Sequence, residues 1–221
     1  MTTNIRLLIF DWDGTLVDSL ERIVGSMQHA AEVCGAQRLS DDAIRAIIGL
    51  SLDKAIVQLY PQLADDPQQV EQMRQAYSDN YLAQEHQPSP FYPGVRDALE
   101  DFRSAGYQLA VATGKSRKGL ARVLDGHGMQ DFFDITRCAD ETRSKPDPLM
   151  LQQILQHCGQ SPAQAIMVGD SPFDLRMANR AQVAPVAVSY GAQPLDVLLQ
   201  EHPVLSIDHF AELQHWLAAS R

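Results

Sequence analysis

The stretch Leu7-Leu8-Ile9-Phe10-Asp11-Trp12-Asp13-Gly14-Thr15 decides the fold of this chain. A short apolar run bounded by a turn signal is typical of a buried strand. Side chains alternate along an extended backbone, so Asp11 and Asp13 point one way and Trp12 points the other. Gly14 permits the sharp turn by which the chain leaves the strand. The sequence therefore predicts paired carboxylates at the end of a buried strand.

Like charges this close repel each other unless a cation joins them. A hard divalent cation with oxygen ligands is the natural partner, because Mg²⁺ is usually held by one or two carboxylates together with a substrate phosphate. The alternative interpretation is a solvated loop rich in aspartate. The remainder of the chain favours the metal site.

Three later segments carry polar residues after apolar runs or in a lysine-containing turn. These segments are Leu109-Ala110-Val111-Ala112-Thr113-Gly114, Ser144-Lys145-Pro146-Asp147-Pro148 and Ile166-Met167-Val168-Gly169-Asp170-Ser171-Pro172-Phe173-Asp174. Together with the first stretch they resemble the four motifs of the haloacid dehalogenase-like superfamily, in its order and with compatible spacing. The similarity covers nearly the whole chain, including Phe91-Tyr92-Pro93-Gly94-Val95, a segment that typically re-enters the core domain.

Strand and helix signals alternate over most of the chain, which predicts an α/β fold, a Rossmann-like, doubly wound parallel sheet. The expected strands are 6–10, 108–113, 135–138, 165–168 and 184–189. Residues 19–87 are the exception, with helical signals near 21–33, 41–48, 52–59 and 67–83. We expect a catalytic core of residues 1–16 and 91–221, and an inserted helical cap domain of residues 17–90 with hinges near 17–19 and 87–93.

The resemblance implies phosphoryl transfer with Asp11 as the nucleophile, because a carboxylate that attacks phosphorus forms an aspartyl-phosphate and divides one difficult transfer into two easier ones. Asp13 would be the general acid and base, first protonating the leaving oxygen and then accepting a proton from water. Mg²⁺ would be held by Asp11, Asp170 and, as the family implies, the backbone carbonyl of Asp13.

The other motif residues would support this chemistry. Thr113 and the amide of Gly114 would hold the transferring phosphate oxygens, and Lys145 would neutralise charge on Asp11 and the phosphoryl group. Asp174 would act through neighbours, by orienting a metal-bound water or by bonding Lys145. Each has a plain alternative: an ordinary strand threonine, a solvated loop lysine, or an aspartate that favours a helix N-terminus. For the basic run Lys115, Arg117 and Lys118, near the second motif, we expect a solvated helix face, with a Lys115 that faces the cleft as the alternative.

The residue at position 13 separates the classes within this superfamily. Dehalogenases and phosphonate-cleaving relatives lack a second aspartate, so Asp13 favours phosphoryl transfer. Sugar-phosphate mutases that resemble β-phosphoglucomutase carry a histidine, a lysine and an arginine in the cap, and the matching positions here are the apolar Ile23, Ile48 and Leu52. Water is therefore the expected acceptor, and the mutase is the alternative.

Among phosphatases the chain most resembles phosphoglycolate phosphatases, through Asp13-Gly14-Thr15-Leu16-Val17-Asp18-Ser19 and Ile47-Ile48-Gly49-Leu50-Ser51. Those enzymes often have asparagine and lysine after the second-motif threonine, whereas this chain has Gly114 and Lys115. Pyrophosphatases, nucleotide phosphatases and a non-catalytic binding protein on the same scaffold stay open, since substrate choice lies in the cap loops. We expect a small, doubly anionic monoester, with specificity contacts in residues 49–54.

The composition of the chain limits the kinds of molecule that it is expected to bind. The net charge of −10 over 221 residues argues against nucleic acid and anionic membranes, which both require a basic surface. No apolar stretch approaches the ~18 residues of a membrane span, and the N-terminus lacks the features of a secretory signal. Cys34, Cys138 and Cys158 form no Cys-x-x-Cys pair, which indicates reduced thiols in a cytoplasmic protein. The expected partner is a small phosphorylated metabolite.

Overall fold

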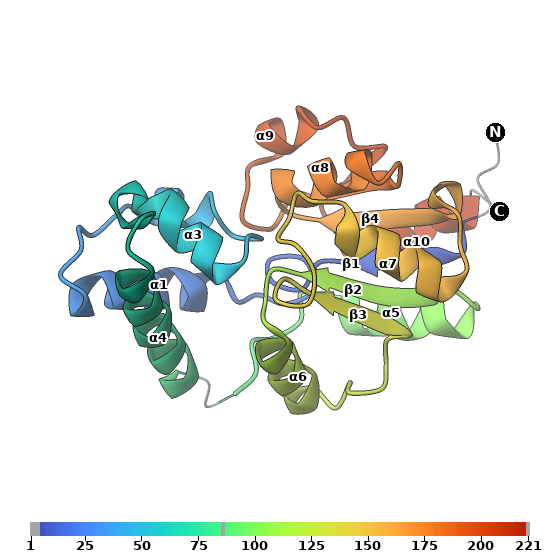
Figure 1. The fold of residues 1–221 in the computed structure, drawn as a ribbon. Coiled ribbons are helices and arrows are strands. Elements are labelled where there is room, and N and C mark those ends of the chain that lie inside the picture. The colour runs from blue at the N-terminus through green and yellow to red at the C-terminus, as the bar shows by residue number, and fades with distance from the viewer. Residues whose placement is uncertain (1–4, 85–86, 220–221) are drawn as a thin grey trace.

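The chain is built around one parallel β-sheet (Figure 1). The computed structural model describes residues 5–84 and 87–219; residues 1–4, 85–86 and 220–221, which the expected domain ranges include, lie outside it. The sheet has six strands in the order β3-β2-β1-β4-β5-β6, and each neighbouring pair is parallel. The strands are β1 (Leu7–Phe10), β2 (Gln108–Thr113), β3 (Ile135–Cys138), β4 (Ala165–Gly169), β5 (Ala184–Val188) and β6 (Leu205–Ile207).

Five of these strands confirm the sequence prediction to within one residue at each end. The sixth, β6, is not predicted. It is three residues long, with Leu205 and Ser206 half-buried, and it pairs with β5 at the edge of the sheet. A strand this short lacks the apolar run or the alternation from which a strand is recognised in sequence.

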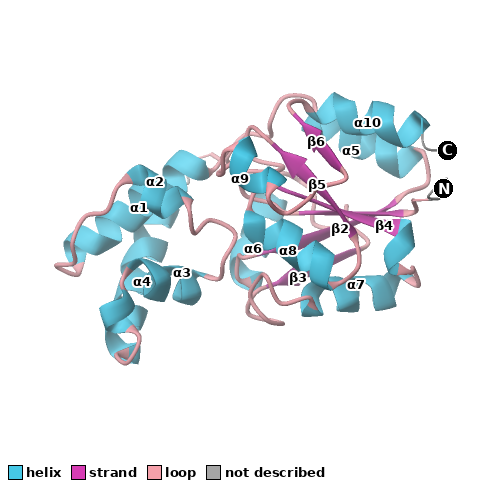
Figure 2. Cartoon of the chain, turned by 90° about the horizontal axis from the view of Figure 1, so that it is seen from above, coloured by secondary structure: helices cyan, strands magenta, loops and turns pink. Residues whose placement is uncertain are grey.

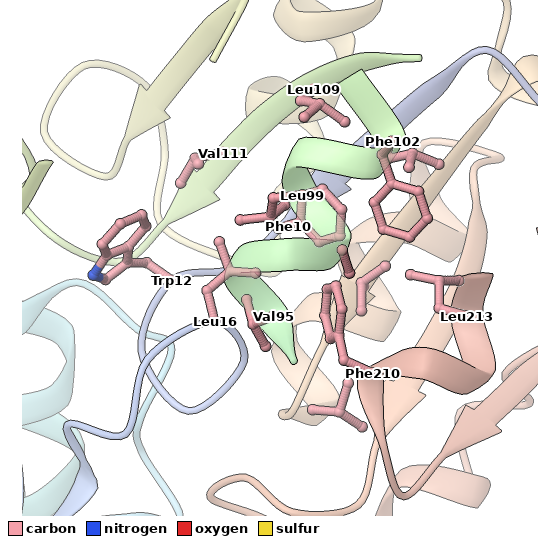
Figure 3. Close-up of a cluster of buried hydrophobic side chains, with 14 of the residues drawn as sticks. Phe10, Trp12, Leu16, Val95, Leu99, Phe102, Leu109, Val111, Phe210 and Leu213 are labelled. Atoms are coloured by element: carbon pink, nitrogen blue, oxygen red, sulfur yellow. The ribbon is translucent and has the colours of Figure 1, made fainter. Parts of the chain in front are cut away.

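Helices cover both faces of the sheet, which confirms the doubly wound α/β architecture (Figure 2). Leu8 and Phe10 of β1 pack in one layer with α5 (Val95–Ser104), α6 (Arg117–Gly126) and α10 (Phe210–Ala219). Figure 3 shows this layer, in which Phe10 lies among Leu99, Phe102 and Phe210. Leu7 and Ile9 face the opposite layer, formed with α7 (Leu149–Cys158) and α8 (Pro172–Arg180). A further helix, α9 (Leu195–Leu199), packs on α8 and β5. The short turn η2 (Pro162–Gln164) precedes β4.

The helices between β1 and α5 lie to one side of the sheet (Figures 1 and 2). They are α1 (Leu20–Val33), α2 (Asp41–Arg45), α3 (Leu52–Leu59), η1 (Pro61–Leu63) and α4 (Pro67–Ala83). We call residues 17–90 the helical segment. Its helices share an apolar cluster around Met27, Ile56 and Met73. Its status as a separate cap domain stays a prediction. The helix expected at 41–48 is shorter than predicted, because α2 ends at Arg45 and turns follow.

The two connections to the helical segment run side by side. Val17 forms an antiparallel bridge with Phe91. The backbone N–H of Asp18 donates to the Pro90 carbonyl at 2.8 Å, and that of Tyr92 donates to the Leu16 carbonyl at 3.0 Å. No helix in the described part of the chain is both long and apolar enough to cross a bilayer.

Candidate active site

The polar residues of all four motifs gather at the carboxyl ends of β1, β2 and β4. The sheet order reverses at β1, whose neighbours are β2 on one side and β4 on the other. In open α/β sheets, ligands bind at such a point, outside the carboxyl ends of the strands. The candidates brought together here are Asp11, Asp13, Thr113, Gly114, Lys145, Asp170 and Asp174.

Lys145 is fully buried between two carboxylates. Its Nζ lies 2.8 Å from Oδ1 of Asp11 and 2.6 Å from Oδ1 of Asp174. Burial lowers the pKa of this lysine, but attraction to Asp11 and Asp174 outweighs it, so the pKa lies above the ordinary value. A buried charge is tolerated only when it is paired in this way. Lys145 is therefore a fixed cation in the site and not a solvated loop lysine.

Asp11, Asp170 and Asp174 each place one oxygen within 4.8 Å of the others, and all three are buried. Burial raises the pKa of Asp11 well above its usual value; Lys145 opposes this rise, while Asp174 and Asp170 add to it. Burial and the neighbouring Asp174 also raise the pKa of Asp170 to about 7. Three carboxylates thus face one lysine, and the cluster needs a further positive charge.

Among the described residues, the carboxylate oxygens without a hydrogen-bond partner show where a cation can bind. Within residues 5–84 and 87–219, Oδ2 of Asp11 is buried without a hydrogen-bond partner. Both oxygens of Asp174 are engaged, Oδ1 by Lys145 and Oδ2 by the Ser171 hydroxyl at 2.6 Å. Hard oxygen donors of this kind suit a divalent cation such as Mg²⁺. The donor set therefore fits the expected metal, with Asp174 directed toward Lys145.

Two hydrogen bonds orient the carboxylate of Asp170 beside that of Asp11. Oδ1 of Asp170 accepts from the Thr15 hydroxyl at 2.9 Å, and its Oδ2 accepts from the Ala192 amide at 2.7 Å. Gly14 has a left-handed φ of 76°, and a Cβ there would lie 2.1 Å from Oδ2 of Asp170. No role for Thr15 is predicted from the sequence, although this residue stands within the first motif. Ala192 acts through a backbone group that carries no sequence signal.

Asp13 is held by two side chains. Its Oδ1 accepts from the Ser19 hydroxyl at 2.6 Å, and its Oδ2 lies 3.0 Å from Nζ of Lys115. The Lys115 side chain is only 13% exposed and lines the cavity, so the alternative of a lysine that faces the cleft holds for this residue and the solvated helix face does not. Arg117, the first residue of α6, has a side chain that is 38% exposed and pairs with Glu141. Lys118 is exposed, as expected.

The reason is the position of Lys115 relative to the helix. Helix α6 begins at Arg117, so Lys115 lies before its first turn. Lys115 stands two residues after Thr113, and its amide donates to the Thr113 hydroxyl oxygen at 3.2 Å. Residues 114 and 115 form a bend after β2, so neither strand nor helix periodicity fixes the direction of the Lys115 side chain. Its closeness to the second motif was the available sequence signal.

A cavity of about 550 Å³ lies between these strand ends and the helical segment. Asp11, Asp13, Thr113 and Gly114 line its core side. The apolar Ile23, Ile48 and Leu52 line the side of the helical segment, together with Gly49, Leu50, Ser51 and Asp53. Of the residues 49–54 expected to contact substrate, Lys54 is absent from this lining and is exposed.

Sequence comparison gives strong matches over most of the chain. The profile of a family described as haloacid dehalogenase-like hydrolases matches residues 8–188. "Probable phosphatase IndB" of Dickeya dadantii (strain 3937) is 34% identical over 211 residues, which cover 94% of this chain and 91% of that protein. "Phosphoglycolate phosphatase" of Vibrio vulnificus (strain CMCP6) is 30% identical over 217 residues, covering 95% and 94%.

Solved structures share the fold over nearly the full length. A predicted phosphoglycolate phosphatase from Haemophilus somnus superposes with a TM-score of 0.83 at 26% identity, covering 96% of this chain and 98% of that one. A Bacteroides vulgatus protein assigned as a β-phosphoglucomutase superposes with a TM-score of 0.84 at 20% identity, covering 99% and 90%. At that identity the second likeness shows the fold alone.

Proposed function

The chain belongs to the haloacid dehalogenase-like hydrolase family, and on that premise we propose that it is a Mg²⁺-dependent phosphomonoester hydrolase. Its substrate would be a small phosphorylated metabolite similar to phosphoglycolate, the substrate named for relatives such as the Vibrio vulnificus protein. The observation that carries the proposal is the arrangement around Asp11. One oxygen of its buried carboxylate is paired with Lys145 and the other has no hydrogen-bond partner in the described structure.

In the first step, a carboxylate oxygen of Asp11 attacks phosphorus and the ester P–O bond breaks, leaving an aspartyl-phosphate. Asp13 gives its proton to the departing ester oxygen. In the second step, water attacks the phosphoryl group, Asp13 takes the proton from that water, and phosphate leaves with Asp11 restored. Both carboxylates line the same cavity, as these alternating roles require.

The remaining residues hold charge and oxygen atoms in place. Thr113 accepts from the Lys115 amide, which leaves its own hydroxyl proton for a phosphoryl oxygen. The Gly114 amide would donate beside it. Lys145 would stabilise the negative charge that is shared by Asp11 and the phosphoryl group. Asp174 keeps Lys145 in position through the 2.6 Å ion pair.

Asp11, Asp170 and the backbone carbonyl of Asp13 would hold the Mg²⁺ ion, which when bound supplies the positive charge that lets a carboxylate approach a phosphoryl group. The Thr15 and Ala192 contacts keep Asp170 directed at Asp11 for this purpose. The raised pKa values of Asp11 and Asp170 support this assignment: burial is the largest cause of both shifts, the neighbouring Asp174 adds to both, and a bound cation would offset both effects.

Water is the proposed acceptor of the phosphoryl group. A mutase must hold a second sugar hydroxyl in place of water, and the positions that would do so are the apolar Ile23, Ile48 and Leu52. The helical segment would act as the cap that closes over substrate and excludes bulk water. We also propose a cytoplasmic location, since the free thiols of Cys34, Cys138 and Cys158 suit a reducing compartment.

Phosphate release tests the proposal directly. The substrates are phosphoglycolate, sugar phosphates, nucleotides and pyrophosphate, each with Mg²⁺ or with a chelator. We expect Mg²⁺-dependent release that is concentrated on one or two small monoesters and is lost in Asp11→Asn. Retained turnover in Asp11→Asn contradicts the nucleophile, and isomerisation of glucose 1-phosphate without phosphate release contradicts the hydrolase.

A further inference from the structure

Lys115 places a buried cation next to the proposed general acid. Its Nζ lies 3.0 Å from Oδ2 of Asp13 and 3.4 Å from the hydroxyl of Tyr81 on α4, and it stands 5.0 Å from the centre of the Tyr81 ring. The Tyr77 ring stacks on Tyr81 with a centroid distance of 5.9 Å. The lysine thus joins the core of the chain to the helical segment across the cavity.

Lys115 and Tyr81 both keep hydrogen-bond donors that are not engaged by Asp13 or by each other. A lysine ammonium has three donors and no acceptor, and its two polar partners among the described residues are Asp13 and Tyr81. Tyr81 accepts from Lys115, so its own O–H remains available to donate. Two donors, one of them charged, therefore converge from opposite walls of the cavity.

Four cations line the cavity in the described structure, namely Arg74, Lys115, Lys118 and Arg122. Lys115 is more enclosed than Arg74 and Lys118. Arg74 pairs with Glu71 and is 40% exposed, and Lys118 is exposed, whereas the Lys115 side chain is 13% exposed. Hydrogen bonds to a charged group in an enclosed site are stronger than those at an open surface.

We infer that Lys115 and Tyr81 form a subsite for a carboxylate on the leaving group of the substrate. The inference rests on the proposed function, in which Asp13 protonates the ester oxygen. A group that contacts Lys115 must lie close to that oxygen, because Lys115 touches Asp13 itself. The substrate class is then the phosphate ester of a short hydroxy acid, with the carboxylate one or two carbons from the ester oxygen.

A pair of nearly isosteric esters isolates this contact. Phosphoglycolate carries the carboxylate, and 2-hydroxyethyl phosphate carries a neutral hydroxymethyl group in its place. We expect wild-type kcat/KM to favour phosphoglycolate by on the order of 100-fold, the range given by a charge-assisted hydrogen bond. In Lys115→Met, kcat/KM should fall for both esters, because the contact with Asp13 is lost, but it should fall by about 10- to 100-fold more for phosphoglycolate than for the neutral ester.

Further variants separate the loss of carboxylate binding from a general effect of charge and from a loss of folding. Lys115→Arg keeps the charge and should retain most of the preference, whereas Tyr81→Phe loses one donor and should lose part of it. Lys54→Met is the matched control, because it removes one lysine charge from an exposed position outside the cavity lining. Turnover of the neutral ester shows that each variant is folded.

An equal loss for both esters in Lys115→Met overturns the inference, since Lys115 would then act only through Asp13. A wild-type enzyme without preference between the esters overturns it as well. Calorimetric binding to Asp11→Asn, with and without Lys115→Met, gives a test independent of turnover. If no ester is hydrolysed but the added Lys115→Met weakens phosphoglycolate binding alone, the proposed function fails and the subsite stands. Equal binding of phosphoglycolate with and without Lys115→Met overturns the subsite.

Discussion

The backbone carbonyl of Leu50 lies so close to Gly114 that a Cβ at position 114 would stand only 2.5 Å from its oxygen. The carbonyl of Gly49 lies almost as close, at 2.6 Å. Gly114 follows β2 at the edge of the site, and Leu50 belongs to the helical segment. Two backbones therefore meet at the position where the sequence departs from the asparagine often found in phosphoglycolate phosphatases.

Gly114→Ala should lower both stability and turnover. The added Cβ meets backbone atoms that have no rotamer by which to withdraw, so the loop at 49–50 must move. We expect a loss of about 1–3 kcal/mol in the free energy of unfolding, the usual effect of overpacking, and a lower kcat/KM. Thermal denaturation and phosphate release measure the two effects.

Gly25→Ala is the control for this change. Gly25 lies within α1, and a Cβ there has nothing within 4 Å. Replacement of a helical glycine by alanine should stabilise the chain by about 1 kcal/mol. A Gly114→Ala protein that melts and turns over like the wild type shows that the two backbones do not keep this contact in solution.

Mg²⁺ should raise the melting temperature through Asp170. A ligand at a concentration of about 100 times its Kd stabilises the folded state by about 2.7 kcal/mol, or roughly 5–11 °C for a chain of this size. In Asp170→Asn this shift should largely disappear, because one of the proposed ligands is gone. Differential scanning fluorimetry with Mg²⁺ and with chelator measures it without substrate. Asp65→Asn, an exposed carboxylate in the helical segment, should keep the full shift; an unchanged shift in Asp170→Asn excludes that residue as a ligand.

The strands and motifs were predictable because burial and function leave local signals. Buried parallel strands form continuous apolar runs, and the site residues follow directly after them, as Asp11 follows Phe10. The edge strand β6 was missed because Leu205-Ser206-Ile207 is short and half-buried at two of its positions. The helix predicted at 41–48 is longer than the observed α2. The buried Ile47 and Ile48 continue the apolar spacing of a helix, but they lie in turns that pack against the site.

Lys115 shows why the site itself was less predictable. In the sequence, Lys115, Arg117 and Lys118 form one run of basic residues. In the structure, Lys115 precedes α6, whereas Arg117 and Lys118 lie in its first turn, so their side chains have different surroundings. Tyr81, which Lys115 contacts, lies 34 positions earlier in the chain. Such a contact depends on how the helical segment packs against the sheet, and no local pattern records it.

Glu141→Gln should destabilise the chain in a pH-dependent way. Glu141 accepts from the Arg117 guanidinium at 2.5 and 2.9 Å and from the Cys138 amide at 3.1 Å, which lowers the pKa of Glu141 from the usual 4.5. A lowered carboxyl pKa contributes stability above the unfolded value, and that contribution disappears as pH falls through the folded value.

The side chains of this pair are 38% and 35% exposed, so solvent screening limits the cost of Glu141→Gln at pH 7 to about 0.5–1 kcal/mol. The difference from wild type should shrink as the pH falls below 4.5 and through the lowered folded-state pKa, because the carboxylate is then protonated in both states. Urea unfolding at pH 7 and pH 3.5 measures it, and Glu32→Gln on the exposed surface of α1 is the control. A difference that is constant across this range assigns the effect to packing and not to the charge.

Phe91→Ala should change kcat and KM together, because Phe91 anchors the second connection to the helical segment. Its ring lies 4.5 Å from that of His127 and 6.1 Å from that of Trp12, which stands between Asp11 and Asp13. We expect a loss of about 1–3 kcal/mol in stability and altered opening and closing of the cavity. Phe133→Ala removes a second ring that contacts Trp12, at 6.3 Å, but one outside the connection. If both variants lose stability equally and neither changes kcat or KM, the connection at Phe91 is structural and does not govern closure.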